Sequence, residues 1–332
     1  MDNNEMLRLE HISKEYSGDR GFLKKPLPPV KAVSDVSFSV FKGETFGIVG
    51  ESGCGKSTLG KCIVRLHEPT DGKMLLNVDG EERDLLSVNK DESFRLRRKI
   101  QMIFQDPYSS LNPSHSILEA FDEPLRVHQM GSKEERQELI AEMLRKVNLQ
   151  PDYMFRFPGE FSGGQRQRIC IAKALAMNPE MIVCDEPVSA LDVSIQAQVL
   201  NLMKKLQREL GLTYIFIAHD LSVVQYMSDR IAVMYLGKVV EIADSENIHN
   251  TFKHPYTEAL LSAVPSPIYG EHKDRIILKG DVPSPMYPPE GCKFHPRCAK
   301  CMEKCRKAEP QLRNIGNNHF VACHLYDENE GE

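Results

Sequence analysis

Residues 50–57, which read GESGCGKS, constrain the fold more than any other part of the sequence. They fit the pattern G-x-x-x-x-G-K-[ST] and lie between an apolar run, 45–49, and a segment of helical character, 57–66. Such a loop turns its backbone N–H groups toward phosphate oxygens, and the N-terminus of the next helix favours the same anion. The run at 45–49 suits a strand buried on both faces. The sequence therefore predicts a parallel α/β fold with a site for nucleotide phosphates.

This P-loop provides most of the predicted nucleotide contacts. Lys56 can reach the β- and γ-phosphates, and the hydroxyl of Ser57 can ligate Mg²⁺. The residues predicted to bind the nucleotide here are Gly50, Glu51, Ser52, Gly53, Cys54, Gly55, Lys56, Ser57 and Thr58.

Two carboxylates, Asp185 and Glu186, follow a second apolar run at 181–184. At the carboxyl end of a parallel strand such groups face the ligand crevice. We expect Asp185 to hold Mg²⁺ through its water shell and Glu186 to orient the attacking water. Because the pKa of a free Glu lies about 11 units below that of water, Glu186 is expected to accept the proton late rather than to deprotonate the water first.

The strands and helices predicted elsewhere in the sequence also favour an α/β fold. Strands are predicted at 7–12, 36–40 and 213–218, and a helix at 193–210 precedes the last of these. Strand, crossover helix and strand is the parallel α/β order. A one-sided apolar helix at 132–149 indicates a helical subdomain inserted at about 106–178.

Composition and charge argue against several classes of protein. With a formal net charge of -5 the chain has no basic footprint, so we expect no nucleic-acid partner. It has no apolar run of the roughly 20 residues that span a bilayer, and its acidic, polar start lacks the features of a signal peptide. We therefore expect a cytosolic chain whose membrane role comes through a partner.

A second glycine loop, at 161–165, reads FSGGQ. Ser162 is a good N-cap, and the residues from 165 to 177 have helical periodicity, so this loop is a second anion site. Since the chain has one P-loop, the extra site is suited to a γ-phosphate bound by another molecule.

With this loop the chain resembles the ATP-binding subunits of ABC transporters over nearly its whole length. The resemblance implies ATP as the nucleotide, Glu186 and His219 as catalytic residues, and His219 as the switch histidine at the γ-phosphate. It makes Gln105 the Q-loop residue that contacts Mg²⁺ and senses the membrane subunits, and Tyr16 the aromatic that stacks on adenine. The implied signature, which acts on partner-bound ATP, is Ser162, Gly163, Gly164 and Gln165, and the implied D-loop is Ser189, Ala190, Leu191 and Asp192.

Within that family, HPYTEAL at 254–260 and DPYSSLNP at 106–113 resemble the oligopeptide/dipeptide importers, and residues 51–58 favour the F-type (OppF/DppF-like) of their two ATPase subunits. This implies an ATP-hydrolysing subunit on the cytoplasmic face of the membrane that powers peptide import. Its implied partners are a second, D-type ATPase in a head-to-tail dimer, two transmembrane permeases and, indirectly, an extracytoplasmic substrate-binding protein. A soluble ABC ATPase of translation or DNA repair, a redox sensor, and transport of nickel complexes or other solutes remain alternatives.

The nine cysteines fall into two groups. Those before residue 185 are predicted to be small buried residues, and the other five lie in a Pro-rich segment, 246–332, predicted to be a metal-stapled module appended to a nucleotide-binding domain at 1–245. The family resemblance implies a [4Fe–4S] cluster held by Cys292, Cys298, Cys305 and Cys323, with structural Zn²⁺ as the alternative and Cys301 as a spare. His295 and His324 are weaker candidates. Because the P-loop is assigned to another domain, ATP binding is expected to survive replacement of each of these five cysteines by Ser.

Overall fold

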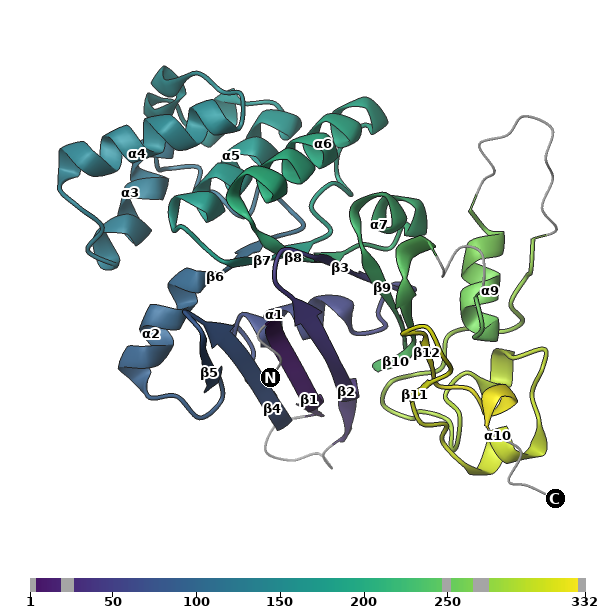
Figure 1. The fold of residues 1–332 in the computed structure, drawn as a ribbon. Coiled ribbons are helices and arrows are strands. Elements are labelled where there is room, and N and C mark those ends of the chain that lie inside the picture. The colour runs from purple at the N-terminus through teal and green to yellow at the C-terminus, as the bar shows by residue number, and fades with distance from the viewer. Residues whose placement is uncertain (1–3, 19–26, 247–251, 265–274, 328–332) are drawn as a thin grey trace. The chain divides into compact units, whose positions relative to one another are not determined.

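The computed structural model describes residues 4–18, 27–246, 252–264 and 275–327, and the chain divides into two compact units. One unit comprises residues 1–6, 41–44 and 76–217, and the other comprises 7–40, 45–75 and 218–332. Figure 1 shows the course of the chain through the strands and helices of both units.

In the first unit, three parallel strands are the framework. They are β6 (Ile100–Ile103), β7 (Met181–Asp185) and β8 (Thr213–Ile217), with β7 in the middle. Every residue of β7 and β8 is buried, as expected for parallel strands covered on both faces. The predicted parallel pair is confirmed, and the carboxyl end of β7 presents Asp185.

The helices of this unit begin where the sequence places capping residues. Ser132 caps α4 (Lys133–Lys146) and Ser162 caps α5 (Gly163–Ala176), and each forms a capping box with the residue three positions on. Both helices bury an apolar side and pack against each other. The other elements are β5 (Glu81–Asp84), α2 (Lys90–Lys99), α3 (Ile117–Val127) and α6 (Val193–Leu210).

In the second unit, the buried strand β3 (Thr45–Val49) pairs in parallel with β9 (Arg230–Tyr235). β9 turns back into the antiparallel β10 (Lys238–Asp244), which pairs with β12 (Phe320–Val321). The last strand of this ladder is β11 (Arg313–Asn314). The C-terminal segment therefore contributes strands to the ladder that contains β3.

The long strands β1 (Glu5–Gly18) and β2 (Leu27–Phe41) lie side by side and include the predicted strands at 7–12 and 36–40. The remaining elements of the second unit include α1 (Lys56–Ile63), α7 (Leu221–Met227), α9 (Pro255–Ser262) and α10 (Glu303–Lys307); β4 (Asp71–Val78) crosses the boundary in the chain between the units. None of the helices that the structure describes is long and apolar enough to span a bilayer.

Candidate functional site

The P-loop connects β3 to α1, as predicted. Gly55 is the N-cap of α1 at a φ of 104°, in the left-handed region that favours glycine. A Cβ there would lie 2.1 Å from the carbonyl oxygen of Ala32, so a side chain is excluded by space as well as by backbone conformation. Gly55 thereby allows the chain to turn from the strand into the helix with its first N–H groups at the loop.

Lys56 is held inside this loop. Its side chain is buried, and Nζ donates to the carbonyl oxygens of Gly50 at 2.7 Å and Glu51 at 3.1 Å. Nζ also lies 3.8 Å from Sγ of Cys54, and burial raises the pKa of that thiol, which keeps it neutral at pH 7. The ammonium group is thus held by neutral groups that phosphate oxygens can replace.

Two other predicted residues, Tyr16 and His219, lie in the same unit as the P-loop. Tyr16 is half-buried, its ring meets His67 edge to face at 5.7 Å, and Nζ of Lys14 lies 5.1 Å from its centroid. His219 is exposed just before α7, whose N-cap Asp220 accepts from the N–H of Ser222 at 2.8 Å.

In the first unit, the end of β7 carries the predicted pair of carboxylates. Asp185 is buried, and Glu186 is half-buried with a φ of 47°, an uncommon conformation for a residue other than glycine. The N–H of Glu186 donates to the carbonyl of Ile217 at 2.8 Å, and its own carbonyl accepts from the N–H and the hydroxyl of Ser189. These bonds hold the strained conformation, and such held strain is typical of functional sites.

The Q-loop residue reaches this carboxylate. Nε2 of Gln105 donates to Oε2 of Glu186 at 3.1 Å. Behind it, Asp106 caps the next turn, because its carboxylate accepts from the N–H of Tyr108 at 2.8 Å, which lowers the pKa of Asp106. Two residues that the sequence assigns to separate motifs are therefore joined directly.

The signature lies against the D-loop within the same unit. Oγ of Ser162 accepts from the N–H of Gln165 at 3.3 Å, so Ser162 is the N-cap of α5, as predicted. A Cβ on Gly163 would come 3.5 Å from Leu191 of the D-loop, whereas a Cβ on Gly164 would come 2.4 Å from Cγ2 of Ile195 in α6. The signature and the D-loop thus form one packed surface, with Asp192 as the N-cap of α6 and Ser189 and Ala190 exposed.

Tyr108 and Ile195, which contact the signature loop, were missed by the sequence reading. The ring of Tyr108 also lies 4.1 Å from the guanidinium of Arg166. The aromatic residue three positions after Gln105 was the available signal, but nothing in the sequence placed it beside the signature.

The four cysteines before residue 185 are buried, as predicted. Cys54, Cys62, Cys170 and Cys184 are buried, and burial raises the pKa of the Cys170 thiol to about 12. None of the nine cysteines is in a disulfide. The first four are therefore inert core thiols.

The predicted metal ligands are gathered but are not arranged as a metal site. Burial is the largest cause of a raised pKa of about 12 at Cys292; the N–H of Phe294 opposes it, and the thiols of Cys305, Cys323 and Cys298 add to it. The four thiols are thus electrostatic neighbours. Within the described part of the chain, however, no group of three or more His, Cys, Asp or Glu side chains is arranged to hold a metal ion. The predicted cluster is therefore not supported by this geometry.

The other candidate ligands are engaged elsewhere. Sγ of Cys301 lies 3.5 Å from the carbonyl of Met302. Nδ1 of His295 lies 2.9 Å from the carbonyl of Cys292. His324 uses both ring nitrogens, one on Asp327 at 2.7 Å and the other on the carbonyl of Ala308 at 2.9 Å. His324 is therefore not available as a ligand in this arrangement.

Comparisons with known proteins place these features in a family. Residues 33–189 match the model of the ABC transporter family. The dimeric structure of a post-hydrolysis state of the ATP-binding cassette MJ0796 bound to ADP and Pi is 32% identical, covering 72% of this chain and 99% of that one with a TM-score of 0.61. The chain is an ABC ATPase.

A second family model matches the chain and identifies the subfamily. Residues 240–305 match the model of the oligopeptide/dipeptide transporter C-terminal region. The oligopeptide transport ATP-binding protein AppF of Bacillus subtilis is 50% identical over 97% of both chains, and OppF of Haemophilus influenzae is 49% identical over 97% of this chain and 98% of its own. The chain belongs to the family of oligopeptide transport ATP-binding proteins, as the motifs predicted.

Proposed function

We propose that this chain is the ATP-hydrolysing subunit of an importer for oligopeptides or dipeptides, acting at the cytoplasmic face of the membrane. The observation that carries the proposal is the presence of both family matches in one chain, at 33–189 and at 240–305. The relatives named for oligopeptide transport favour this function over a translation factor, a repair enzyme or a redox sensor. Uptake of labelled peptides with and without this gene tests it, and unchanged uptake would point to another solute.

In this proposal the P-loop N–H groups and Lys56 hold the phosphates, and Tyr16 stacks on the adenine. Ser57, Gln105 and Asp185 each carry an oxygen donor of the kind that a hard cation prefers, and Asp185 would act through water. Mg²⁺ held by such oxygens would neutralise the charge on the phosphate oxygens.

Glu186 is proposed to orient the attacking water and to accept its proton late in the reaction. Its held backbone and its bond from Gln105 support this role, because they fix the direction of the carboxylate. Gln105 could report the state of the membrane subunits to Glu186 through that bond. His219 is proposed to contact the γ-phosphate.

We infer that the signature acts on ATP bound by a second, D-type ATPase subunit beneath two permeases, with an extracytoplasmic binding protein delivering peptide. The MJ0796 cassette, a relative with the same fold, is described as dimeric. Purified alone, the chain is expected to be a poor ATPase, and adding the second subunit should raise the rate well above the sum of the two. Steady-state kinetics with size-exclusion chromatography test this. A fully active homodimer would refute the heterodimer and leave the chemistry intact.

The signature packing gives a second prediction. In Gly164→Ala the new methyl group would press on Ile195, and overpacking of this kind costs about 1–3 kcal/mol. We expect the partner-stimulated ATPase rate to fall by about ten- to hundredfold, because small misplacements of catalytic parts have effects of that size. Binding of ATP to the chain's own P-loop should be unchanged.

Two further variants test whether contact with Ile195 causes the loss of rate in Gly164→Ala. Ile195→Ala added to Gly164→Ala should restore most of the rate, because it removes the colliding methyl group. Gly163→Ala, which meets only ordinary van der Waals contacts, should lose less than Gly164→Ala. Failure of Ile195→Ala to rescue would show that glycine is needed at 164 for another reason.

We also propose that the segment 246–332 is a module stapled by a [4Fe–4S] cluster, or by Zn²⁺, on Cys292, Cys298, Cys305 and Cys323. Their mutual electrostatic effects support the choice of these four. Burial raises the pKa of Cys298 and, to about 11, that of Cys323; the N–H groups of Lys300 and Leu325 donate to these sulfurs, oppose that rise and would stabilise the thiolates once a metal is bound. Since no ligand set is preformed among the described residues, the thiols would have to turn toward a common centre on binding.

A further inference from the structure

The P-loop contains a carboxylate, Glu51, in a loop that is suited to hold a polyanion. That carboxylate is paired with Arg297, which lies 246 positions further along the chain. Nη1 of Arg297 donates to Oε2 at 2.7 Å and Nη2 donates to Oε1 at 3.1 Å, the bidentate geometry of a strong charge-assisted pair. The Arg297 side chain is only 8% exposed, so the pair is weakly screened by solvent.

The other polar groups of Glu51 are also engaged. Its N–H donates to the hydroxyl of the fully buried Tyr256 at 2.9 Å, and its carbonyl accepts from Lys56. Arg297 and Tyr256 both belong to residues 240–305, the part that matches the oligopeptide/dipeptide transporter C-terminal region. The C-terminal segment therefore contacts the first turn of the P-loop through both the side chain and the backbone of one residue.

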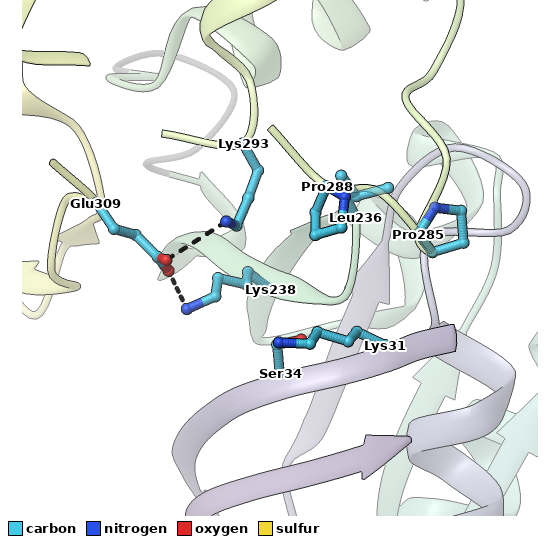
Figure 2. Close-up of a pocket in the computed structure, with 8 residues that line it drawn as sticks. All are labelled: Lys31, Ser34, Leu236, Lys238, Pro285, Pro288, Lys293 and Glu309. Carbon is cyan, nitrogen blue, oxygen red and sulfur yellow. Dashed lines mark ion pairs between the residues drawn. The ribbon is translucent and has the colours of Figure 1, made fainter. Parts of the chain in front are cut away.

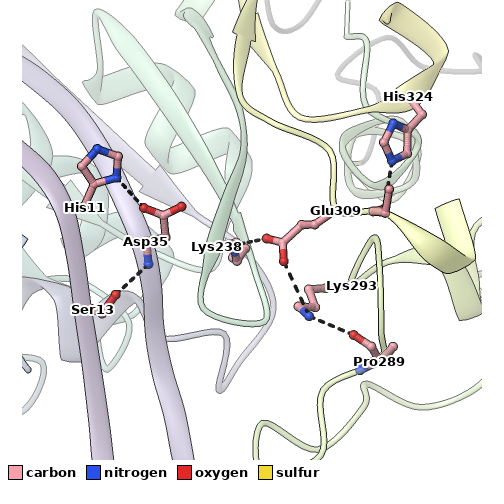
Figure 3. Close-up of polar contacts among 9 residues, drawn as sticks. His11, Ser13, Asp35, Lys238, Pro289, Lys293, Glu309 and His324 are labelled. Atoms are coloured by element: carbon pink, nitrogen blue, oxygen red, sulfur yellow. Dashed lines mark hydrogen bonds and ion pairs between the residues drawn. The ribbon is translucent and has the colours of Figure 1, made fainter. Parts of the chain in front are cut away.

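A second polar link lies beside the first. Figure 3 shows the carboxylate of Glu309 between Lys238 at the start of β10 and Lys293 of the C-terminal segment. Gly237, the residue before Lys238, donates its N–H to the carbonyl of Cys54 in the P-loop at 2.8 Å. The same three charged residues line a pocket of about 150 Å³ (Figure 2) together with Lys31, Leu236 and Pro285.

We propose that Arg297 is a positioning residue of the nucleotide site, which neutralises Glu51 and so lets the C-terminal segment set the affinity of the P-loop for ATP. The proposal rests on the assignment of residues 50–57 as the ATP site. An unpaired Glu51 carboxylate would repel the triphosphate, and one unit charge close to a polyanion in a partly buried site changes affinity by about tenfold. With Arg297 in place the pair is neutral and the repulsion is cancelled.

This arrangement changes the expectation that ATP binding is independent of the C-terminal segment. Arg297 immediately precedes Cys298, one of the proposed metal ligands. Disorder of that turn would withdraw the guanidinium and leave Glu51 charged. A change in the cysteines can therefore reach the nucleotide through one ion pair.

The test is a titration of the full-length chain with a fluorescent ATP analogue in the presence of Mg²⁺. Arg297→Gln should weaken binding by about tenfold, because Glu51 is left unpaired. Glu51→Gln should bind as tightly as the wild type or more tightly, because it leaves Arg297 uncompensated near the phosphates. The double variant should return to within about threefold of the wild type. Lys307→Gln, which breaks an exposed pair with Glu303 in the same segment, is the matched control.

The signs of the two single variants separate charge neutralisation from mere support of the fold. Equal weakening by Arg297→Gln and Glu51→Gln, without recovery in the double variant, would overturn the proposal. If Arg297→Gln fails to fold, as judged by circular dichroism, weaker binding by Glu51→Gln alone would overturn it. Absence of binding in the wild type would instead refute the assignment of the ATP site.

Discussion

Glu186→Gln is expected to retain ATP binding while losing hydrolysis by about 10²- to 10⁴-fold, the usual contribution of a positioned general base. The amide has nearly the shape of the carboxylate, and its oxygen can still accept from Nε2 of Gln105, so the geometry at the end of β7 should be kept. The amide cannot accept a proton from the attacking water. With turnover blocked, ATP should hold this subunit against the proposed partner ATPase.

The measurement is single-turnover hydrolysis with the partner subunit and permeases present, beside a binding titration. Glu209→Gln makes the same chemical change at an exposed position of α6, where Glu209 pairs with Lys205, and should leave the rate unchanged. Near-normal hydrolysis by Glu186→Gln would remove the proposed role. Loss of ATP binding together with hydrolysis would show that Glu186 acts in binding.

The fold around the P-loop could be predicted because its signals are local. The strand at 45–49 and the helix at 193–210 have the predicted bounds, since a buried apolar run and a one-sided apolar helix are visible within one window of sequence. The starts of α4 and α5 could also be predicted, because each is marked by a capping Ser, Ser132 or Ser162, whose partner lies only three positions later. β1 is longer than the predicted 7–12, because strand pairing continues where the apolar alternation has ended.

The contacts that connect the motifs could not be predicted in the same way. Arg297 and Glu51 are 246 positions apart, and Tyr256 and Glu51 are 205 apart, so no local pattern links them. One signal was nevertheless present in the sequence. A carboxylate inside an anion-binding loop needs a cation, and that need alone could have prompted a search for a basic partner.

If the proposed metal is present in the C-terminal segment, replacing Cys292, Cys298, Cys305 or Cys323 with Ser is expected to remove it and to open residues after about 244 to proteolysis. Thiolate coordination can supply on the order of 10 kcal/mol, which exceeds what a small, proline-rich segment gains from its own core. Protein purified without oxygen should be brown, with visible absorption near 400 nm that is typical of iron–sulfur clusters in general. Each of the four Ser variants should lose that absorption.

Cys301→Ser is the matched control, because the Cys301 thiol lies against the carbonyl of Met302 and is the one cysteine of the segment left out of the proposed set. It should keep both the colour and the resistance to protease. One zinc and no iron after anaerobic handling would replace the cluster with a structural zinc site, whereas neither metal would refute coordination altogether. Loss of metal in Cys301→Ser with Cys305→Ser unaffected would mean that the ligand set is wrong.

If the four variants also weaken ATP binding by about the factor seen in Arg297→Gln, the same ion pair accounts for both results, because withdrawal of Arg297 leaves Glu51 charged in either case.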